Sequence, residues 1–419
     1  MNFSLEKYLG TCKCGKNHSL ITTETTIRSK AADDLPEVAK KLGLSSGACV
    51  ICDENTLAFA ERASERIQDL LHSIKPITVL NPAGLHADEV SVERVLTQLP
   101  ADSKWLLAAG SGTIHDITRY VAHKRGIPFV SFPTAASVDG FVSDGCAMTW
   151  YGFKKTIPAT APVAVVADTD IFANAPYRLT ASGVGDVLGK YISLADWQIA
   201  NIISDEGFCP EIAAISRKAV NHVRDNLDAI YRREPDAMEK LMYAQLLSGI
   251  AMQMWGTSRP ASGIEHLFSH LWEMEVINTH LDALHGEKVG VGLNIALPLY
   301  KRMAARPDFG KGFKKYEGLP HELLKSKYGK LYQAVVDENT PDSAYGVSHE
   351  KFTARIDDIR DIIAGLPDEK ALREDLDRAK VLTSLSQIGL DDSYIEDTIA
   401  LAPFIRNRVT LLRASREML

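Results

Sequence analysis

The chain has 419 residues, of which 45% are hydrophobic and 24% charged, and its formal net charge is −7 at pH 7. This length predicts two domains, and the mixing of acidic and basic residues argues against nucleic acid or an anionic membrane as the main partner. We find no secretory signal and no apolar stretch long enough to cross a bilayer, and the six scattered cysteines favour reduced thiols in a cytoplasm.

Two cysteines and a histidine stand close together near the N-terminus, in the order Cys12, Cys14 and His18. Two thiols and an imidazole could hold Zn²⁺, but a four-coordinate site needs a fourth ligand. Moreover, Cys-x-Cys is not the usual spacing of zinc ligands. We therefore prefer a terminal hairpin or strand with exposed thiols over a metal site.

Strand and helix patterns alternate through the first third of the chain. Residues 25–42 read as mostly helical. They are followed by strands at 48–52, 77–80, 105–109 and 129–132 and by helices at 57–73, 90–98 and 114–124. This alternation predicts a parallel sheet that is covered by helices on both faces.

Two features at the ends of these strands indicate a nucleotide site. Gly110-Ser111-Gly112 leads into a helix that Thr113 could cap, and a helix N-terminus behind a glycine turn binds anions such as a pyrophosphate. Asp53 could bind a ribose diol and would then favour NAD over NADP. The alternatives are an ordinary tight turn, because the third glycine of the full fingerprint is missing, and a helix cap at Asp53.

The pattern changes near residue 170. Residues 150–156 suggest a hairpin or an excursion, and 163–167 suggest one more buried strand. Helical periodicity then dominates to the end of the chain. We therefore predict an α/β dinucleotide-binding domain over 1–170 and an all-α metal-binding and substrate domain over 171–419.

Three motifs in the helical part carry residues that can bind a metal. Asp186 lies near a helix start, His266 and His270 are four residues apart and share a helix face, and His285 precedes a glycine. Aspartate and histidine suit Zn²⁺, Fe²⁺ or Ni²⁺, and three protein ligands leave a position open for substrate. Spacing alone favours His266 and His270 as two of the ligands. Each histidine taken singly could instead be an ordinary, hydrogen-bonded polar residue.

Taken together, the motifs resemble the bacterial form of the sn-glycerol-1-phosphate dehydrogenase family, within the superfamily of metal-dependent polyol dehydrogenases and dehydroquinate synthase. The matching stretches are GSGTIHD, FPTAASVDGFVSDG, GVGDVLGK with SLADW, SRPASGIEHLFSH and LHGEKVGVG, in family order. The resemblance implies a Rossmann-like α/β domain, a helical domain and a divalent metal in the cleft between them. It also implies a homodimer.

The same resemblance implies a role for individual residues. Asp186, His266 and His285 match the metal ligands, and Asp139, Asp186 and His270 match substrate contacts, so His270 is not a ligand on this reading. His270 would also serve in catalysis, together with the three ligands. The nicotinamide-cofactor contacts would be Asp53, Gly112, Thr113, Ile114, His115, Asp116, Thr134, Ala135, Ala136, Ser137 and Ser143.

The activity implied is hydride transfer between NAD(H), or NADP(H), and C2 of a three-carbon phosphate, the pair being dihydroxyacetone phosphate and sn-glycerol 1-phosphate of phospholipid metabolism. The metal would be zinc or nickel rather than iron. Arg259, Lys154 and Lys155 are candidate phosphate ligands by their charge, although at least two of them are expected to be ordinary surface charges. The alternatives are a glycerol or other polyol dehydrogenase with the same metal site, a dehydroquinate-synthase-like lyase, and a metal-binding scaffold without catalysis.

Overall fold

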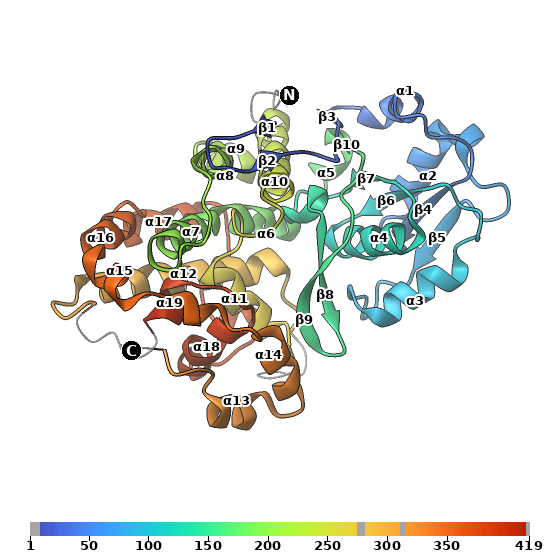
Figure 1. Cartoon of the computed structure of the whole chain (residues 1–419). Helices are drawn as coiled ribbons and strands as arrows, with labels where there is room; N and C mark the ends of the chain where they lie inside the picture. The colour runs from blue at the N-terminus through green and yellow to red at the C-terminus, as the bar shows by residue number, and fades with distance from the viewer. Residues whose placement is uncertain (1–8, 275–280, 311–315, 416–419) are drawn as a thin grey trace.

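A six-stranded parallel sheet forms the centre of the α/β lobe, and a helical lobe packs beside it (Figure 1). The computed structural model describes residues 9–274, 281–310 and 316–415. The strand order is β3-β10-β7-β6-β4-β5, and every neighbouring pair is parallel. The strands are β3 (Glu24–Arg28), β4 (Ala48–Asp53), β5 (Ile77–Leu80), β6 (Trp105–Gly110), β7 (Phe129–Pro133) and β10 (Ala164–Asp168).

Helices cover both faces of this sheet, as the alternating pattern predicts. Side chains alternate along β4, so that Val50 and Cys52 pack with α1 and α2 while Cys49 and Ile51 pack with α3 and α4. The helices are α1 (Leu35–Lys41), α2 (Leu57–Arg66), α3 (Glu89–Gln98) and α4 (Gly112–Arg125), with 3₁₀-helices η2 (Ala31–Asp34) and η3 (Gln68–Leu70).

The prediction of a mostly helical segment over 25–42 is wrong at its start. Thr25, Thr26 and Ile27 lie in β3, which pairs in parallel with β10 at the edge of the sheet. These β-branched residues suit a strand, and their partner is more than a hundred residues further along the chain. Helical structure begins only at η2 and continues in α1.

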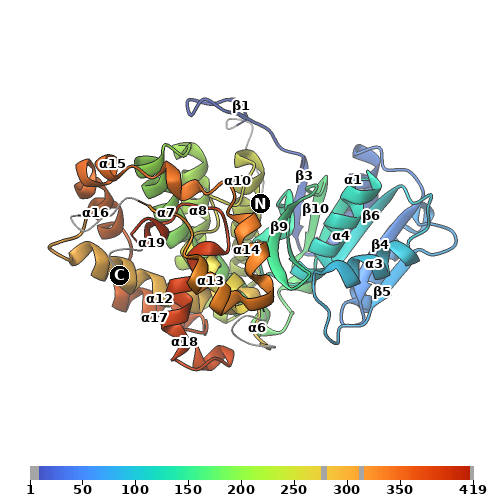
Figure 2. The ribbon, with the colours of Figure 1, turned by 60° about the horizontal axis from the view of Figure 1, so that its bottom comes forward.

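Two antiparallel hairpins lie outside the main sheet. β8 (Gly145–Trp150) pairs with β9 (Phe153–Pro158), so the predicted hairpin over 150–156 is confirmed and is longer than predicted. Figure 2 shows this hairpin between the two lobes. The terminal hairpin is also confirmed, as β1 (Gly10–Thr11) and β2 (Asn17–His18), but Cys12 and Cys14 are half-buried instead of exposed.

The described residues after β10 form helices and connecting segments. The longer helices are α6 (Tyr177–Leu188), α7 (Lys190–Ser204), α8 (Pro210–Arg224), α10 (Pro235–Trp255), α11 (Ile264–Trp272) and α12 (His285–Ala305). Shorter ones are α5 (Thr169–Phe172), α9 (Leu227–Tyr231), α13 (His321–Tyr328), α14 (Tyr332–Glu338), α15 (His349–Ala354), α16 (Ile356–Ala364), α17 (Glu369–Arg378), α18 (Tyr394–Leu401) and α19 (Leu411–Ala414). The 3₁₀-helices are η4 (Gly140–Val142), η5 (Gly329–Leu331), η6 (Ser343–Gly346), η7 (Ser386–Ile388) and η8 (Ala402–Phe404).

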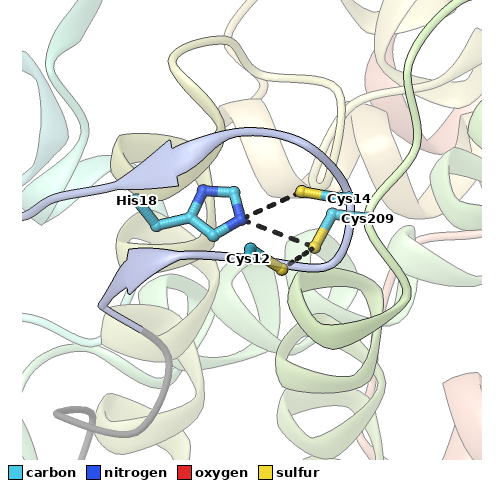
Figure 3. A group of neighbouring side chains, drawn as sticks. All are labelled: Cys12, Cys14, His18 and Cys209. Carbon is cyan, nitrogen blue, oxygen red and sulfur yellow. Dashed lines mark hydrogen bonds between the residues drawn. The ribbon is translucent and has the colours of Figure 1, made fainter.

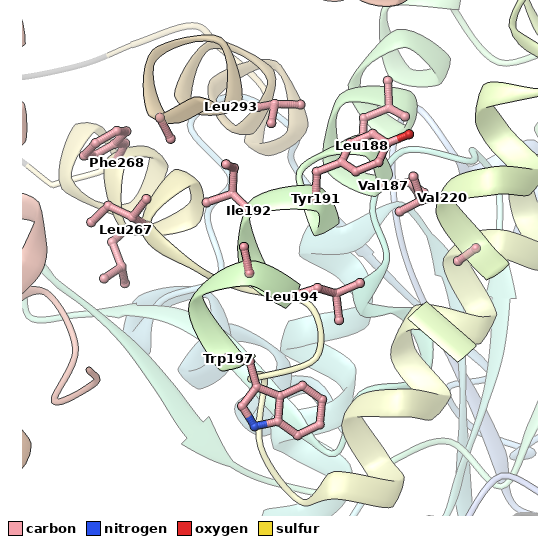
Figure 4. Packing of buried hydrophobic residues seen from close by; sticks show 14 of the residues in the cluster. Val187, Leu188, Tyr191, Ile192, Leu194, Trp197, Val220, Leu267, Phe268 and Leu293 are labelled. Carbon is pink, nitrogen blue, oxygen red and sulfur yellow. The ribbon is translucent and has the colours of Figure 1, made fainter. Parts of the chain in front are cut away.

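Helix α7 runs through the middle of the helical core. Its side chains Ile192, Leu194 and Trp197 are buried among apolar residues of α6, α8, α11 and α12 (Figure 4). The same apolar cluster includes Val165 and Ala167 of β10, so the two lobes share buried contacts. The exact domain boundary near residue 170 therefore stays a prediction, although β10 ends at Asp168.

None of the helices in the described ranges combines the length and the apolar character that crossing a membrane would require.

Candidate active site

A cavity of about 880 Å³ lies between the α/β lobe and the helical lobe. The carboxyl ends of the parallel strands contribute one part of its wall, and α11, α12 and the β8–β9 hairpin contribute another. Ligands of open α/β sheets bind at this edge. The polar and glycine residues of its wall include Asp53, Gly112, Thr113, Asp116, Ser137, Asp139, Ser143, Lys154, His266, His270, Glu273, His285 and Lys288.

The N-terminus of α4 opens into this cavity. The helix begins at Gly112, directly after Ser111, whose backbone is extended, and no described side chain caps it. The prediction that Thr113 caps the helix is therefore wrong: Thr113 lies in the first turn and lines the cavity. A Cβ atom on Gly110 would lie 2.6 Å from the Ile114 side chain, so glycine is needed there for the turn to close. The first N–H groups of α4 are thus left for an anion.

Asp53 has the position expected of a ribose contact, but it is not the N-cap of α2, which is Thr56. It is the last residue of β4 and lines the cavity. Its Oδ1 atom also accepts hydrogen bonds of 2.9 Å from the backbone N–H and from the hydroxyl of Thr56. The carboxylate therefore fixes the turn before α2 while it faces the cavity.

The other predicted cofactor contacts divide into two groups. Gly112, Thr113, Asp116, Ser137 and Ser143 line the cavity, whereas Ile114, His115, Thr134, Ala135 and Ala136 are not part of the described wall.

His115 holds α4 against β7. Its Nδ1–H group donates to the Ser111 carbonyl at 2.9 Å, and its Nε2 atom accepts from the Ser131 hydroxyl at 2.8 Å. Burial lowers the pKa of His115 to about 3, so the ring is neutral at ordinary pH. The side chain therefore positions α4 from behind the cavity wall.

Asp186, His266 and His285 come together beside the cavity, although they belong to three different helices. One ligand atom from each side chain lies within 4.8 Å of those of the other two. Asp186 is in the last turn of α6, His266 is in α11, and His285 is the first residue of α12. This is a donor set that can hold a divalent metal ion.

The glycines of the two motifs allow this approach of helices. A Cβ atom on Gly286 would lie 1.9 Å from the Ser182 carbonyl oxygen, and one on Gly183 would lie 2.1 Å from the Ala136 carbonyl oxygen. Both contacts are with backbone, which cannot swing aside. Glycine at these positions therefore lets α6 lie directly against α12 and against the loop after β7.

Hydrogen bonds fix the orientation of both histidines, and the Nε2 atom of His266 also lies 3.2 Å from Asp186 Oδ1, a carboxylate oxygen that can only accept. His266 donates from Nδ1 to Glu265 at 2.6 Å, and His285 donates from Nδ1 to Glu273 at 2.9 Å. A carboxylate behind an imidazole in this way fixes the tautomer that binds metals. Burial alone would lower the pKa of His266, but its contacts with Asp186 and Glu265 raise it, so these carboxylates stabilise a positive charge on the ring.

A buried lysine sits beneath the carboxylates. The Lys190 ammonium donates to Asp186 Oδ1 and Asp139 Oδ2, both at 2.8 Å, and all three side chains are at least 90% shielded from solvent. Burial alone would raise the pKa of Asp186, but Lys190 and His266 lower the pKa well below its ordinary value. Asp186 is therefore ionised and is held in place by Lys190 and by the Asp139 N–H, at 2.9 Å from its Oδ2.

His270 lies in the cavity wall one turn after His266. Its ring centroid is 5.7 Å from that of His285, but its Nδ1 atom has no hydrogen-bond partner among the described residues. Burial, and then the nearby Arg406 charge, hold the pKa of His270 well below its ordinary value. A neutral imidazole with an unpaired nitrogen in a cavity is suited to contact a ligand.

The three candidate phosphate ligands have different surroundings. Arg259 is buried in an ion pair with Glu206, and Lys155 lies outside the described cavity wall. Lys154 lines the cavity and pairs with Glu273 at 2.7 Å. The sequence reasoning missed Lys288, which also lines the cavity, with its Nζ atom 3.6 Å from Glu273.

Four residues around the histidines escaped the sequence reasoning: Lys190, Glu265, Glu273 and Lys288. Lys190 was detectable, because an aspartate and a lysine four residues apart face each other on a helix. Glu273 had no such signal, since its ion-pair partners His285, Lys154 and Lys288 all come from other elements.

Comparison with known proteins places the chain in a family. A model of iron-containing alcohol dehydrogenases matches residues 26–176. The glycerol-1-phosphate dehydrogenase (NAD(P)+) of Bacillus licheniformis is 33% identical over 414 residues, which cover 98% of this chain and 92% of that protein. This chain belongs to the glycerol-1-phosphate dehydrogenase family. The family member of the same name from Geobacillus stearothermophilus is 33% identical over 427 residues, or 100% of this chain and 99% of that protein.

The fold is shared more widely than the family. A probable glycerol dehydrogenase from Sinorhizobium meliloti 1021 superposes with a TM-score of 0.61 at 20% identity, covering 94% of this chain and 95% of that chain. The predicted fold class, a Rossmann-like α/β part followed by a helical part, is thereby confirmed, as is the predicted family.

Proposed function

We propose that this chain interconverts dihydroxyacetone phosphate and sn-glycerol 1-phosphate by hydride transfer at C2, with NAD(H) or NADP(H) as the second substrate. Family membership supports the reaction. The observation that carries the proposal is the grouping of Asp186, His266 and His285 within 4.8 Å beside a cavity that extends to the N-terminus of α4.

Asp186, His266 and His285 would hold one divalent metal ion, zinc or nickel. The donor set fits, because the Nδ1 atoms of the histidines face Glu265 and Glu273, which leaves Nε2 as the ring atom that would bind the metal. When bound, such an ion polarises a carbonyl oxygen as a Lewis acid. Lys190 and the Asp139 N–H keep the Asp186 carboxylate in a single orientation.

His270 and Asp139 would position the reacting end of the substrate. In the reduction, C2 accepts a hydride from the nicotinamide and the carbonyl oxygen gains a proton. His270 has an unpaired Nδ1 atom with which to bind a substrate hydroxyl or relay this proton. Asp139 Oδ2 is engaged by Lys190 and by Ser248, at 2.7 Å, which leaves Oδ1 to accept from a substrate hydroxyl.

Cofactor and substrate phosphate would be bound by different groups of the cavity wall. The uncapped N-terminus of α4 suits the pyrophosphate, and the Asp53 carboxylate suits a ribose diol, which favours NAD over a 2′-phosphorylated cofactor. Lys154 and Lys288 share one carboxylate, Glu273, so this group keeps one net positive charge for the substrate phosphate. This charge is what separates a glycerol phosphate substrate from glycerol itself.

The test compares sn-glycerol 1-phosphate with glycerol as substrates in steady-state assays with NAD+. We expect a large preference for the phosphate ester, and we expect Lys154→Met to lower kcat/KM for the ester about tenfold or more through loss of a charged hydrogen bond. Lys155→Met, one residue further on and outside the described cavity wall, is the matched control and should change little. Equal use of glycerol and its phosphate would point to a polyol dehydrogenase.

The metal assignment is tested in the same assay. His285→Ala should lose both the metal of this site and turnover while the far-ultraviolet circular dichroism stays that of the wild type. If His285→Ala still oxidised sn-glycerol 1-phosphate without a bound metal, the proposed mechanism would be wrong. Net accumulation of NADH excludes the lyase alternative, which regenerates its cofactor within each turnover.

A further inference from the structure

A second group of metal-binding side chains lies at the N-terminal hairpin, and nothing in the proposed reaction uses it. Cys12, Cys14 and His18 come from the β1–β2 hairpin, and Cys209 comes from the residue before α8 (Figure 3). One ligand atom from each of the four side chains lies within 4.8 Å of those of the other three. Cys209 is the fourth ligand whose absence made a metal site here unattractive from sequence alone.

Three of the six ligand–ligand distances within this group are known, and they are close to the edges of a tetrahedral zinc site. The Sγ atoms of Cys12 and Cys209 are 3.7 Å apart, and His18 Nε2 lies 3.3 Å from Cys14 Sγ and 3.6 Å from Cys209 Sγ. Zinc with its usual bond lengths to sulfur and nitrogen gives S···S edges of about 3.8 Å and S···N edges of about 3.6 Å. The four side chains therefore already have nearly the spacing that the ion requires.

The protonation state of His18 also fits a metal ligand. Its Nδ1 atom is 2.9 Å from the Met254 carbonyl oxygen, which can only accept, so Nδ1 carries the proton. In the neutral ring, Nε2 then carries a lone pair, and Figure 3 shows this atom facing the sulfur atoms of Cys14 and Cys209. A backbone carbonyl behind a histidine in this way is the usual support of a metal-binding imidazole.

The hairpin itself is shaped to present the two thiols. The backbone N–H of Cys12 donates to the Lys16 carbonyl at 2.9 Å, and that of Gly15 donates to the Cys12 carbonyl at 3.0 Å, which closes a tight turn around Cys14. Gly15 has φ of +86°, a conformation that glycine adopts without strain. The two strands have only two residues each, too few to hold a hairpin by themselves.

We propose that Cys12, Cys14, His18 and Cys209 bind one Zn²⁺ ion in a closed structural site. Four protein ligands leave no open position for a substrate, so the site would stabilise structure and take no part in the reaction. The ion would fasten the hairpin to the start of α8. Residues 10–23, here called the strap, run from the hairpin to β3 at the edge of the parallel sheet. The ion would therefore anchor the start of this strap to the helical lobe, while its end leads into the α/β lobe.

Further contacts show the same strap lying on α10. The Lys16 ammonium lies 3.5 Å from the centre of the Trp255 ring, and the Gln253 side chain accepts from the Ile21 N–H at 3.1 Å and donates to the Thr22 hydroxyl at 2.8 Å. These contacts are individually weak, and a metal site at the tip of the hairpin would hold them together.

Metal analysis in a variant without the Asp–His site tests this proposal. His285→Ala, purified with a thiol reductant and dialysed, should keep about one zinc per chain, and His285→Ala with Cys14→Ser should keep almost none. Cys49→Ser is the matched control. Cys49 is a buried cysteine outside the group, with Lys75 O at 3.4 Å and Ser103 Oγ at 3.3 Å to bind a hydroxyl, so this variant should keep the zinc.

Two outcomes would overturn the proposal. The first is equal zinc in two His285→Ala proteins, one with Cys14→Ser and one with Cys49→Ser. The second is a protein that carries no tightly bound metal and instead shows a disulfide between Cys12 and Cys209 in peptide mapping without reductant. Neither outcome depends on the proposed dehydrogenase activity, because the metal count is made without substrate.

A spectroscopic and a proteolytic measurement guard against a variant that misfolds. Cobalt in place of zinc in the wild type should show thiolate charge-transfer bands and intense tetrahedral d–d bands, which are lost in Cys14→Ser and kept in Cys49→Ser. Trypsin should cleave after the exposed residues Lys13 and Lys16 about tenfold faster in Cys14→Ser, because the hairpin opens more often. Unchanged cobalt bands, or unchanged cleavage, in Cys14→Ser would contradict the proposal.

Discussion

Single charged residues decide the electrostatic balance of this buried site. Lys190 is fully buried and compensates two carboxylates at once, those of Asp139 and Asp186. Two ionised carboxylates without a cation would be costly in such a place, so the lysine is part of the site even though it does not line the cavity. It leaves Asp186 ionised and able to bind a metal.

We predict that Lys190→Met lowers the free energy of unfolding of the metal-free protein by roughly 3–5 kcal/mol, since removing one partner of a buried ion pair leaves the other uncompensated. Urea denaturation followed by circular dichroism measures this. Lys240→Met is the matched control: Lys240 pairs with Asp236 at 2.8 Å in the same i, i+4 arrangement, but on the surface. It should cost about 1 kcal/mol or less. Similar losses in the two variants would mean that Lys190 contributes no more than a surface pair.

At the level of whole elements, the site depends on how closely α6 approaches its neighbours. The last turn of α6 carries Asp186, and Gly183 one turn earlier sits against the Ala136 carbonyl in the loop after β7. The same loop leads to Asp139, whose N–H binds Asp186. Any outward shift of α6 therefore moves Asp186 away from both His266 and the cavity.

We predict that Gly183→Ala destabilises the protein by about 1–3 kcal/mol or more, because its Cβ would lie 2.1 Å from a backbone oxygen that cannot rotate away. It should also weaken metal binding, measured by equilibrium dialysis, since the helix must move. Gly346→Ala is the control, because the nearest atom to its added Cβ is 4.0 Å away. Unchanged metal affinity in Gly183→Ala would show that α6 can shift without moving Asp186.

Considered as a whole, the molecule places its site where the lobes meet. The wall of the cavity combines the strand ends of the sheet with α11 and α12 of the helical lobe. The three proposed ligands lie on helices that are separated by up to about a hundred residues along the chain. A metal ion bound by all three would link helices that only the tertiary fold brings together.

We predict that nickel or zinc stabilises the folded protein through this link. At about 100 times the Kd, binding to the native state alone adds about 2.7 kcal/mol to the free energy of unfolding. Differential scanning fluorimetry of the wild type and of His285→Ala, each with and without added metal, isolates this site, because both proteins keep the cysteine group. An equal rise in Tm in both proteins would assign the stabilisation to another site.

Much of the fold follows from patterns that are local in the sequence. The alternation of short apolar runs and amphipathic helices predicted the parallel sheet, and strands such as β4 and β6 end within one residue of their predicted ends. The predicted start of α4, at residue 114 after a Thr113 cap, is two residues too late. The helix begins at Gly112, directly after Ser111, whose backbone is extended and whose side chain does not cap the helix. β3 was missed because its partner strand in the sheet, β10, lies far along the chain.

The candidate site likewise has features that the sequence predicted and features that only the tertiary structure revealed. The order and composition of the motifs by themselves determined the family and predicted the helix N-terminus for a cofactor, because each lies in a short stretch whose residue types are unusual together. The three proposed ligands came from the family resemblance, since spacing alone favoured His266 and His270. Only the tertiary structure decided that Lys190 neutralises two carboxylates, that Glu273 orients His285, and that Cys209 completes a group with Cys12, Cys14 and His18. The physical reason is that a residue's charge partners and metal partners are set by distance in space, and distance along the chain predicts this only within one helix or one turn.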